Sequence, residues 1–222
     1  MYELPDRDLI EGLAAADIVD AMTKTYDHRS HILDLASPDS SKVLFGPAVT
    51  IGFLPVRRDL MDVHKHSLGP AIYQSLGERK MEGRVLVMSS SGHHDASLGG
   101  STKLSRVTNH GLAGVLCDGR LRDFDELAEF SGAFYCRGEA IRAGGNVIQP
   151  YVSDVPVEVA GVTVVPGDII YADETGGVVI PADAVEEILT SARMIKEMGT
   201  KMADKIRSED PADILENGSQ EI

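Results

Sequence analysis

The sequence predicts an α/β protein with a single domain, in which helices flank a partly parallel sheet. Two short apolar strands, Val85–Met88 and Gly114–Cys117, are separated by a polar loop and a helix-like segment over residues 101–110. This order is that of a βαβ unit, whose strands lie parallel. Beyond residue 130 the chain is rich in alternating β-branched residues, and segments with helical spacing lie at both ends.

The first half combines helical and extended segments. Residues 6–24 are expected to form one helix with Asp6 as its N-cap, and residues 43–54 to form a strand broken by Gly46-Pro47. Residues 59–77 have apolar spacing typical of a helix, which Gly69-Pro70 is expected to interrupt.

The second half predicts hairpins followed by a helix. Residues 155–168 alternate around a turn at Gly161, and residues 169–172 and 177–180 flank a second turn. A helix with one apolar face is expected from Asp183. Residues 1–208 are therefore interpreted as one domain, and residues 209–222 as an acidic C-terminal tail that is frayed or packed against a partner.

Composition narrows the class of protein. The 222 residues carry 35 acids and 21 bases, a net charge of −14 that disfavours nucleic-acid binding. No apolar run is long enough for a membrane span, and no signal peptide is recognisable. The two cysteines, Cys117 and Cys136, lie in apolar or aromatic stretches and are interpreted as buried free thiols rather than a disulfide or metal site. We expect a cytoplasmic protein.

An arginine and an aspartate follow the second buried strand. In parallel sheets the loops at the carboxyl ends of neighbouring strands share one crevice, so residues 89–102 and 118–123 are expected side by side. Arg122 is suited to holding a carboxylate and stabilising an oxyanion, and Asp123 to ligating Mg²⁺ or Mn²⁺. Taken alone, such a pair is also common on solvated surfaces.

The loop before the 101–110 helix offers further candidates. Glycines such as Gly100, placed before a helix, expose amides that bind anions, although a simple turn capped by Ser101 or Thr102 explains the pattern equally well. His94 and Asp95 are candidates for a proton relay, whereas adjacent histidines do not suit a zinc site. His64 and His66 are interpreted as surface or structural residues.

These motifs together resemble the RraA-like family, which includes the regulator of ribonuclease activity A and the class II 4-hydroxy-4-methyl-2-oxoglutarate aldolases. The resemblance runs from about Ala15 to Glu197. It rests on Ala16–Ala21, Gly46–Thr50, Gly111–Asp123, Gly161–Asp168 and Ala172–Pro181.

The resemblance implies a β/β/α swivelling-type single domain with flanking N- and C-terminal helices, assembled as a homotrimer or dimer of trimers with sites between subunits. It implies that Arg122 binds a 2-oxo acid and that Asp123 ligates Mg²⁺ (or Mn²⁺) largely through water. Backbone amides of the loop formed by Gly100, Ser101, Thr102 and Lys103 would hold the substrate carboxylate. Glu197 is a candidate contribution from a neighbouring subunit.

One position departs from the aldolase pattern. The aldolases have an acidic residue with twenty residues between it and the arginine, and here that position is Ser101. The sequence predicts a divalent-metal-dependent carbon–carbon lyase that forms a pyruvate-enolate-type intermediate, by oxaloacetate-type decarboxylation, aldol cleavage or both. The alternative is a non-catalytic regulator that binds a protein such as a ribonuclease. Methyl transfer is disfavoured because no glycine-rich cofactor loop is recognisable.

Overall fold

A mixed sheet forms the centre of the molecule. The computed structural model describes residues 5–62, 64–77 and 79–218. The sheet contains β1 (His31–Ile32), β2 (Leu44–Pro55), β3 (Val85–Ser89), β5 (Gly114–Cys117), β7 (Ala133–Tyr135), β8 (Ile148–Ser153), β11 (Ile169–Asp173) and β12 (Gly176–Ile180). The strands follow the order β1-β12-β11-β2-β3-β5-β7, and β8 pairs with β2 off this path.

Strands β2, β3, β5 and β7 are neighbours in this order and run parallel. Helix α3 (Ser101–Asn109) lies between β3 and β5 in the chain. The predicted βαβ unit is therefore confirmed. The remaining pairings in this sheet are antiparallel, including the predicted hairpin of β11 and β12.

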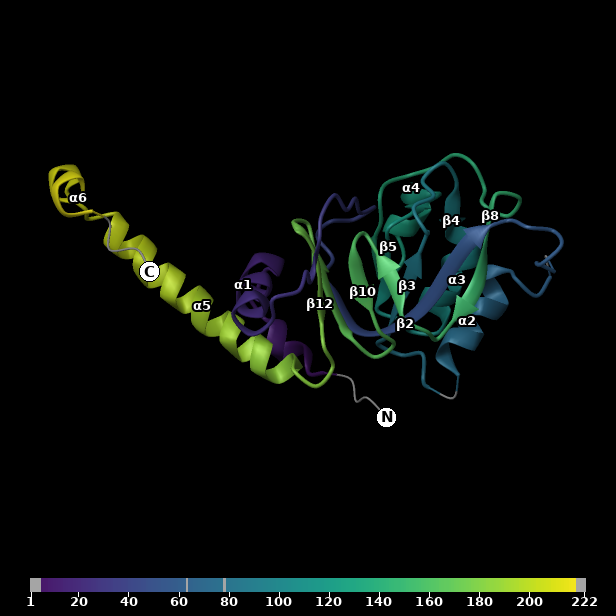
Figure 1. Ribbon diagram of the computed structural model, residues 1–222, viewed down its shortest axis with the longest axis horizontal. Coiled ribbons are helices and arrows are strands. Elements are labelled where there is room, and N and C mark those ends of the chain that lie inside the picture. Colours follow the sequence, from purple (N-terminus) through teal and green to yellow (C-terminus); the bar gives the residue numbers. More distant parts are fainter. Residues whose placement is uncertain (1–4, 63, 78, 219–222) are drawn as a thin grey trace.

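Both faces of the parallel strands are covered, because alternate residues point to opposite sides. Leu86 and Met88 face a core shared with α2 (Leu68–Leu76) and α3. Val85 and Val87 face a second core shared with the hairpin of β9 (Val157–Val159) and β10 (Val162–Val164). Hairpin, sheet and helices thus form the β/β/α layers that were expected (Figure 1).

Two further helices cover the antiparallel end of the sheet. The buried faces of α1 (Ala15–Thr25) and α5 (Val185–Ile206) share a third core with residues of β11 and β12. Only the first half of α5 is covered, and the rest projects from the body with α6 (Pro211–Asn217) at its tip (Figure 1). Part of the acidic tail is therefore helical. Within the described residues, none of the helices combines the length and apolar composition that crossing a bilayer requires.

The single helix predicted over residues 6–24 is wrong. The structure has a 3₁₀ helix, η1 (Arg7–Ile10), capped by Asp6 as expected, and then α1. Gly12 separates them with a φ of 71°, which an α-helix does not accommodate. The start of α1 is stabilised by Asp17, whose carboxylate accepts a hydrogen bond from the Ala14 amide at 2.9 Å.

Neither predicted proline interruption occurs. Strand β2 continues through Gly46-Pro47, because Pro47 pairs with Ile169 of β11 and the pairing with β3 begins only at Ala48. Helix α2 includes Gly69-Pro70 in its first turn, where amides have no intrahelical acceptor and a proline costs little.

Candidate active site

Two short strands bring the predicted loops together. After β3 and β5 the chain forms β4 (Ser97–Gly99) and β6 (Arg120–Leu121), which pair in parallel. The Arg122 amide extends this ladder by donating to the Gly99 carbonyl at 3.0 Å. The predicted juxtaposition of the two loops at one edge of the sheet is therefore correct.

Asp123 connects this ladder to the start of α3. One carboxylate oxygen, Oδ2, accepts hydrogen bonds from the amide and the hydroxyl of Ser101, both at 3.1 Å. The other, Oδ1, accepts from Arg122 Nε at 3.1 Å. Asp123 has a φ of 67°, a conformation that aspartate tolerates better than most residues.

Gly100 is required by the close approach of this pair. A Cβ at residue 100 would lie 2.5 Å from Asp123 Oδ2 and 3.4 Å from Arg122 Nε. Since Gly100 is the N-cap of α3 and no acidic side chain occupies the helix's first turn, the positive end of the helix dipole faces this point.

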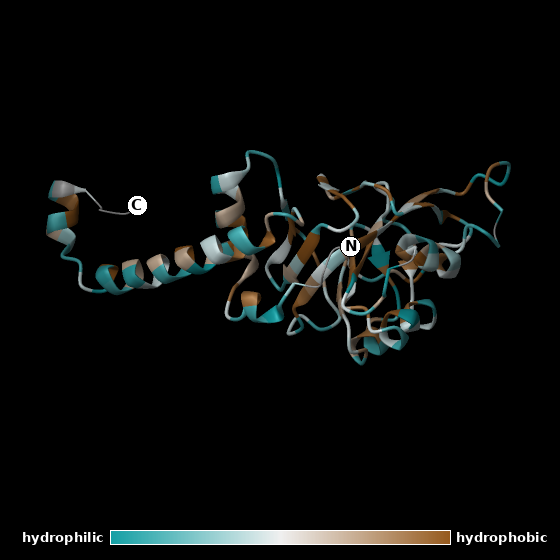
Figure 2. Ribbon diagram, turned by 90° about the horizontal axis from the view of Figure 1, so that it is seen from below, coloured by the Kyte–Doolittle hydropathy of each residue, from teal (hydrophilic) through white to brown (hydrophobic). Residues whose placement is uncertain are grey.

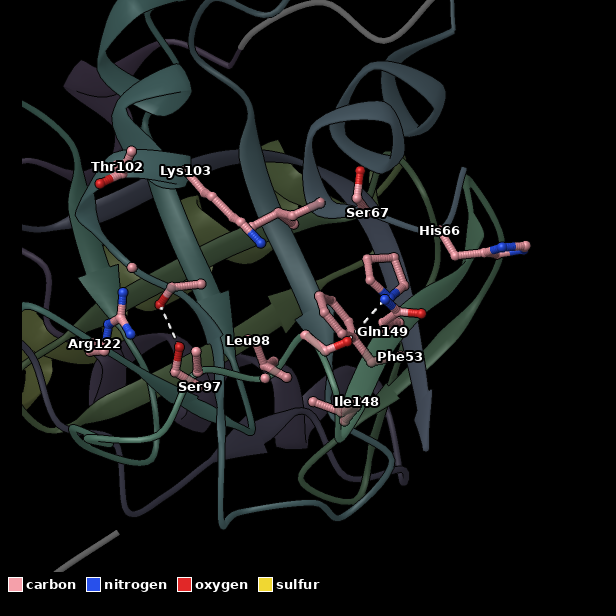
Figure 3. Close-up of a pocket in the computed structure, with 17 residues that line it drawn as sticks. Phe53, His66, Ser67, Ser97, Leu98, Thr102, Lys103, Arg122, Ile148 and Gln149 are labelled. Carbon is pink, nitrogen blue, oxygen red and sulfur yellow. Dashed lines mark hydrogen bonds between the residues drawn. The ribbon is translucent and has the colours of Figure 1, made fainter. Parts of the chain in front are cut away.

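A cavity of about 250 Å³ opens beside these groups. Figure 3 shows Arg122, Thr102 and Lys103 on one side, and Phe53, Gln149 and His66 on the other. Leu98 and Ile148 add apolar surface between them. The cavity therefore has a cationic side, an opposite side that combines polar and apolar groups, and apolar surface between them.

Charge within the cavity contrasts with that of the whole chain. Arg122 and Lys103 both line it, and among the described residues none of the lining side chains is a carboxylate. In a protein with a net charge of −14, this local excess of positive charge favours a small anion.

The donor set fits only a largely hydrated metal ion. Within the described ranges, no group of three or more histidine, cysteine or acidic side chains is placed to hold a metal. Asp123 supplies one partly exposed carboxylate, and the Ser101 hydroxyl lies beside it. One carboxylate with several waters is a usual arrangement for Mg²⁺, so the residues present fit Mg²⁺ but not an all-protein cage.

Some candidate residues do not line this cavity. Ser101 and Asp123 are among them, although their neighbours Gly100, Thr102 and Arg122 do line it. His94 and Asp95 are exposed, and Asp95 instead lies 3.8 Å from Arg142 in an ion pair. Glu197 is exposed on the projecting part of α5. The proton relay proposed for His94 and Asp95 is not assembled within one protomer.

Other residues of the cavity were missed from the sequence. Phe53 comes from the end of β2, Ile148 and Gln149 from β8, and His66 from the segment before α2. The sequence by itself indicates only a surface or structural role for His66. Antiparallel pairing of β8 with the end of β2 brings Phe53 opposite Pro150, and no local pattern predicted this pairing.

Both cysteines are buried and free, as expected. Burial raises the pKa of the Cys117 thiol well above its ordinary value, which disfavours the reactive thiolate.

Fold and cavity together define a β/β/α domain with an anion-attracting crevice at the carboxyl ends of its parallel strands. The chain belongs to the RraA-like family, described as Aldolase/RraA, whose model matches residues 15–180.

The chain is similar to three proteins that carry different descriptions. Protein DlpA of Legionella pneumophila is 26% identical over 69% of this chain, a segment that makes up only 24% of DlpA. A Burkholderia mallei protein, provisionally named a 4-hydroxy-4-methyl-2-oxoglutarate aldolase, is 38% identical over 50% of this chain and 66% of its own length. The crystal structure of Streptomyces coelicolor RraAS2, described as an unusual member of the RNase ES inhibitor RraA family, superposes with a TM-score of 0.76 at 28% identity, covering 91% of this chain and 99% of RraAS2.

Proposed function

We propose that this protein is a divalent-metal-dependent lyase that cleaves a carbon–carbon bond in a 2-oxo acid. The observation that carries the proposal is the Arg122–Asp123 pair, fixed by the β4–β6 ladder against the start of α3 and beside a cavity lined by cations. The Burkholderia relative supports the same reaction class.

Arg122 has the central role in this mechanism. Its guanidinium binds the oxygens of the 2-oxo acid head, and the positive end of the α3 dipole attracts the carboxylate, while the Ser101 amide is held by Asp123. When the bond to C3 breaks, its electron pair forms a double bond between C2 and C3, and the carbonyl π pair moves onto oxygen. The product is an enolate, whose negative oxygen Arg122 stabilises. A proton then returns to C3. Mg²⁺ held by Asp123 and water would supply Lewis-acid polarisation of the 2-oxo group.

Position 101 decides which bond breaks most readily. Aldol cleavage requires a base to remove the proton of the substrate's hydroxyl, whereas decarboxylation releases CO₂ without that base. Ser101 has a hydroxyl in place of the carboxylate base. This side chain is buried and donates its hydrogen to Asp123. A positioned base contributes about 10²- to 10⁴-fold. We therefore propose that oxaloacetate-type decarboxylation exceeds aldol cleavage.

The test is a panel of 2-oxo acids assayed for pyruvate release with Mg²⁺, with Mn²⁺ and with EDTA. Oxaloacetate should be turned over faster than 4-hydroxy-4-methyl-2-oxoglutarate, and EDTA should remove both activities. Ser101→Asp should raise aldol cleavage more than decarboxylation, with Ser105→Asp, one turn later on α3, as the control. Efficient aldol cleavage by the unaltered protein would contradict the assigned preference and direct attention to Asp95→Asn and His94→Ala. No metal-dependent pyruvate release from any substrate would overturn the lyase.

A second candidate function is supported by the similarity to RraAS2. A non-catalytic regulator would bind a ribonuclease and reduce its activity. Such binding should survive Arg122→Ala, because it does not need the cavity, whereas lyase activity should not. A ribonuclease assay with both proteins separates the two functions.

A further inference from the structure

The positive charges of the cavity are confined to one of its sides. Arg122 and Lys103 lie there together (Figure 3), and no other Lys or Arg is among the described residues that line the cavity. The head of a 2-oxo acid has a carboxylate and an oxygen that becomes negative in the proposed reaction, so the head alone uses both cations. The rest of the cavity therefore has no cation for a second carboxylate.

Beyond the cationic side, the cavity is bounded by residues of the protein core. Phe53 of β2 and Ile148 of β8 are each 2% exposed, and Leu98 of β4 is 5% exposed. All three belong to the core shared with α2 and α3. Figure 2 shows apolar residues recurring along the strands of the body, from which these side chains come. A substrate group that reaches them leaves water, which favours an alkyl group and penalises a carboxylate that finds no partner.

Gln149 adds a polar group to this region, and the atom that it leaves without a partner is an acceptor. Its Nε2 donates to the Gly145 carbonyl at 3.0 Å (dashed in Figure 3), and a carbonyl oxygen can only accept, so the amide orientation is fixed. Its Oε1 is buried and has no hydrogen-bond partner among the described residues. A carboxylate placed against Gln149 would meet another acceptor oxygen.

His66, on the same side as Gln149, is also not arranged to bind an anion. Its Nδ1 lies 3.1 Å from the Asp62 carbonyl oxygen, so this nitrogen carries the hydrogen. In the neutral ring Nε2 is then an acceptor. The ring stacks on Tyr151 with centroids 5.7 Å apart, which fixes its plane.

We propose that the protein selects 2-oxo acids whose tail, the part of the molecule beyond C3, ends in an uncharged group such as an alkyl group. The inference rests on the proposed function, because it takes Arg122 and Lys103 as the site of the 2-oxo acid head. The tail then extends towards Leu98, Ile148 and Phe53, where burial stabilises an uncharged group and a second carboxylate loses its hydration. Oxaloacetate lies outside this rule, because the carboxylate that it loses is attached to C3 itself.

Two 2-oxo acids that the proposed reaction cannot cleave test this selection by binding alone. 2-Oxoglutarate and 5-methyl-2-oxohexanoate have the same chain and differ only in a terminal carboxylate or an isopropyl group of similar shape. Calorimetric titration with Mg²⁺ present, at a pH of about 8 where an ordinary histidine is neutral, measures both. The isopropyl acid should bind about tenfold more tightly or better. Pyruvate, which is the head alone, is the reference.

His66→Arg gives a second test, because it places a cation on the side opposite Arg122. It should tighten the binding of 2-oxoglutarate about fivefold or more and so reduce the preference for the isopropyl acid. Leu54→Arg is the matched control. Leu54 follows Phe53 in β2 but is 40% exposed and does not line the cavity, so the same added charge should leave the preference unchanged.

The outcomes separate this inference from the proposed function. Equal binding of the two acids by the wild-type protein, or tighter binding of 2-oxoglutarate, would overturn the selection and leave the 2-oxo acid lyase in place. Binding of none of the three acids would contradict the proposed function and the inference with it. An equal effect of His66→Arg and Leu54→Arg would overturn the assignment of this side of the cavity to the tail.

Discussion

Asp123 makes hydrogen bonds to two parts of the candidate site. It holds the Ser101 amide and hydroxyl at the start of α3, and it accepts from the Arg122 guanidinium. Its carboxylate is therefore both the candidate metal ligand and the group that sets the direction of Arg122. Substitution of Asp123 tests its role as a metal ligand. Substitution of Gly100, which lies against the Arg122–Asp123 pair, tests the importance of how the pair is placed.

Asp123→Ala should abolish Mg²⁺-stimulated turnover and leave the fold intact, because the residue lies in a loop and contributes little to core packing. Alanine at a φ of 67° adds backbone strain of about 1 kcal/mol. Asp123→Asn, which tolerates this φ and keeps the shape, is the matched variant. Initial rates against Mg²⁺ concentration check the prediction. Wild-type Mg²⁺ dependence in both variants would exclude Asp123 as the ligand.

Gly100→Ala should lower kcat/KM by about 10²-fold, the cost typical of a displacement near 1 Å at a reacting centre. Its new Cβ would lie 2.5 Å from Asp123 Oδ2, so the Arg122–Asp123 pair must shift. Gly145→Ala is the control, since Gly145 lines the same cavity and a Cβ there meets nothing within 4 Å. Equal activities of the two variants would show that the position of the pair is not critical.

At the scale of elements, local patterns predicted β2, β3, β5, the two hairpins and helices α3 and α5, but not the short strands β4, β6, β7 and β8, nor how proline acts in context. Both Gly46-Pro47 and Gly69-Pro70 predict interruptions. In the structure Pro47 lies in β2 just before the pairing with β3 begins, and Gly69-Pro70 lies in the first turn of α2. Whether a proline interrupts an element depends on which strand lies beside it and on where a helix begins. The spacing of apolar residues predicts neither.

The same distinction applies to the candidate site. Arg122, Asp123 and the start of α3 were predicted because parallel strands bring their following loops to one edge. Phe53, His66 and Gln149 were not, because the β2–β8 pairing and the segment before α2 bring them to the cavity from elsewhere in the chain.

Strand β7 has a titratable residue whose effect on stability can be predicted. Burial raises the pKa of Tyr135 to about 12, and its hydroxyl donates to the Lys42 carbonyl at 2.7 Å. Above pH of about 10, the unfolded chain releases this proton before the folded one does, so stability falls as pH rises from about 10 to about 12. Burial also raises the pKa of Tyr171, which adds to the same slope.

Tyr135→Phe should therefore flatten the dependence of unfolding free energy on pH by up to about 1.4 kcal/mol per pH unit in that window. At neutral pH the variant should be less stable by about 1 kcal/mol, because the hydrogen bond to Lys42 is lost. Urea unfolding at several pH values measures both effects. An unchanged slope would mean that Tyr135 ionises equally well in the folded protein.

At the scale of the whole molecule, the cavity of one chain lacks a carboxylate that could transfer protons during the proposed chemistry. No carboxylate lines it in the part of the chain that the structure describes, and Glu197 lies on the projecting half of α5. We therefore propose that Glu197 approaches the cavity of a neighbouring subunit in a homotrimer or dimer of trimers.

Light scattering should give three or six times the 23.8 kDa of one chain. Glu197→Gln should lower turnover without changing this mass, whereas Glu186→Gln, earlier on α5, should change neither. A stable monomer at micromolar concentration that retains full activity would contradict a site shared between subunits.

The opposition between the cationic cavity and the acidic chain has a consequence for the dependence on ionic strength. An approaching anion is repelled by the net charge of −14 at long range and attracted by Arg122 and Lys103 only at close range. At about 0.1 M salt, charges more than about 10 Å apart are largely screened. Salt therefore weakens the long-range repulsion by the acidic chain more than the short-range attraction by Arg122 and Lys103. Added salt should therefore speed the association of a 2-oxo acid before it weakens binding, the reverse of ordinary electrostatic steering.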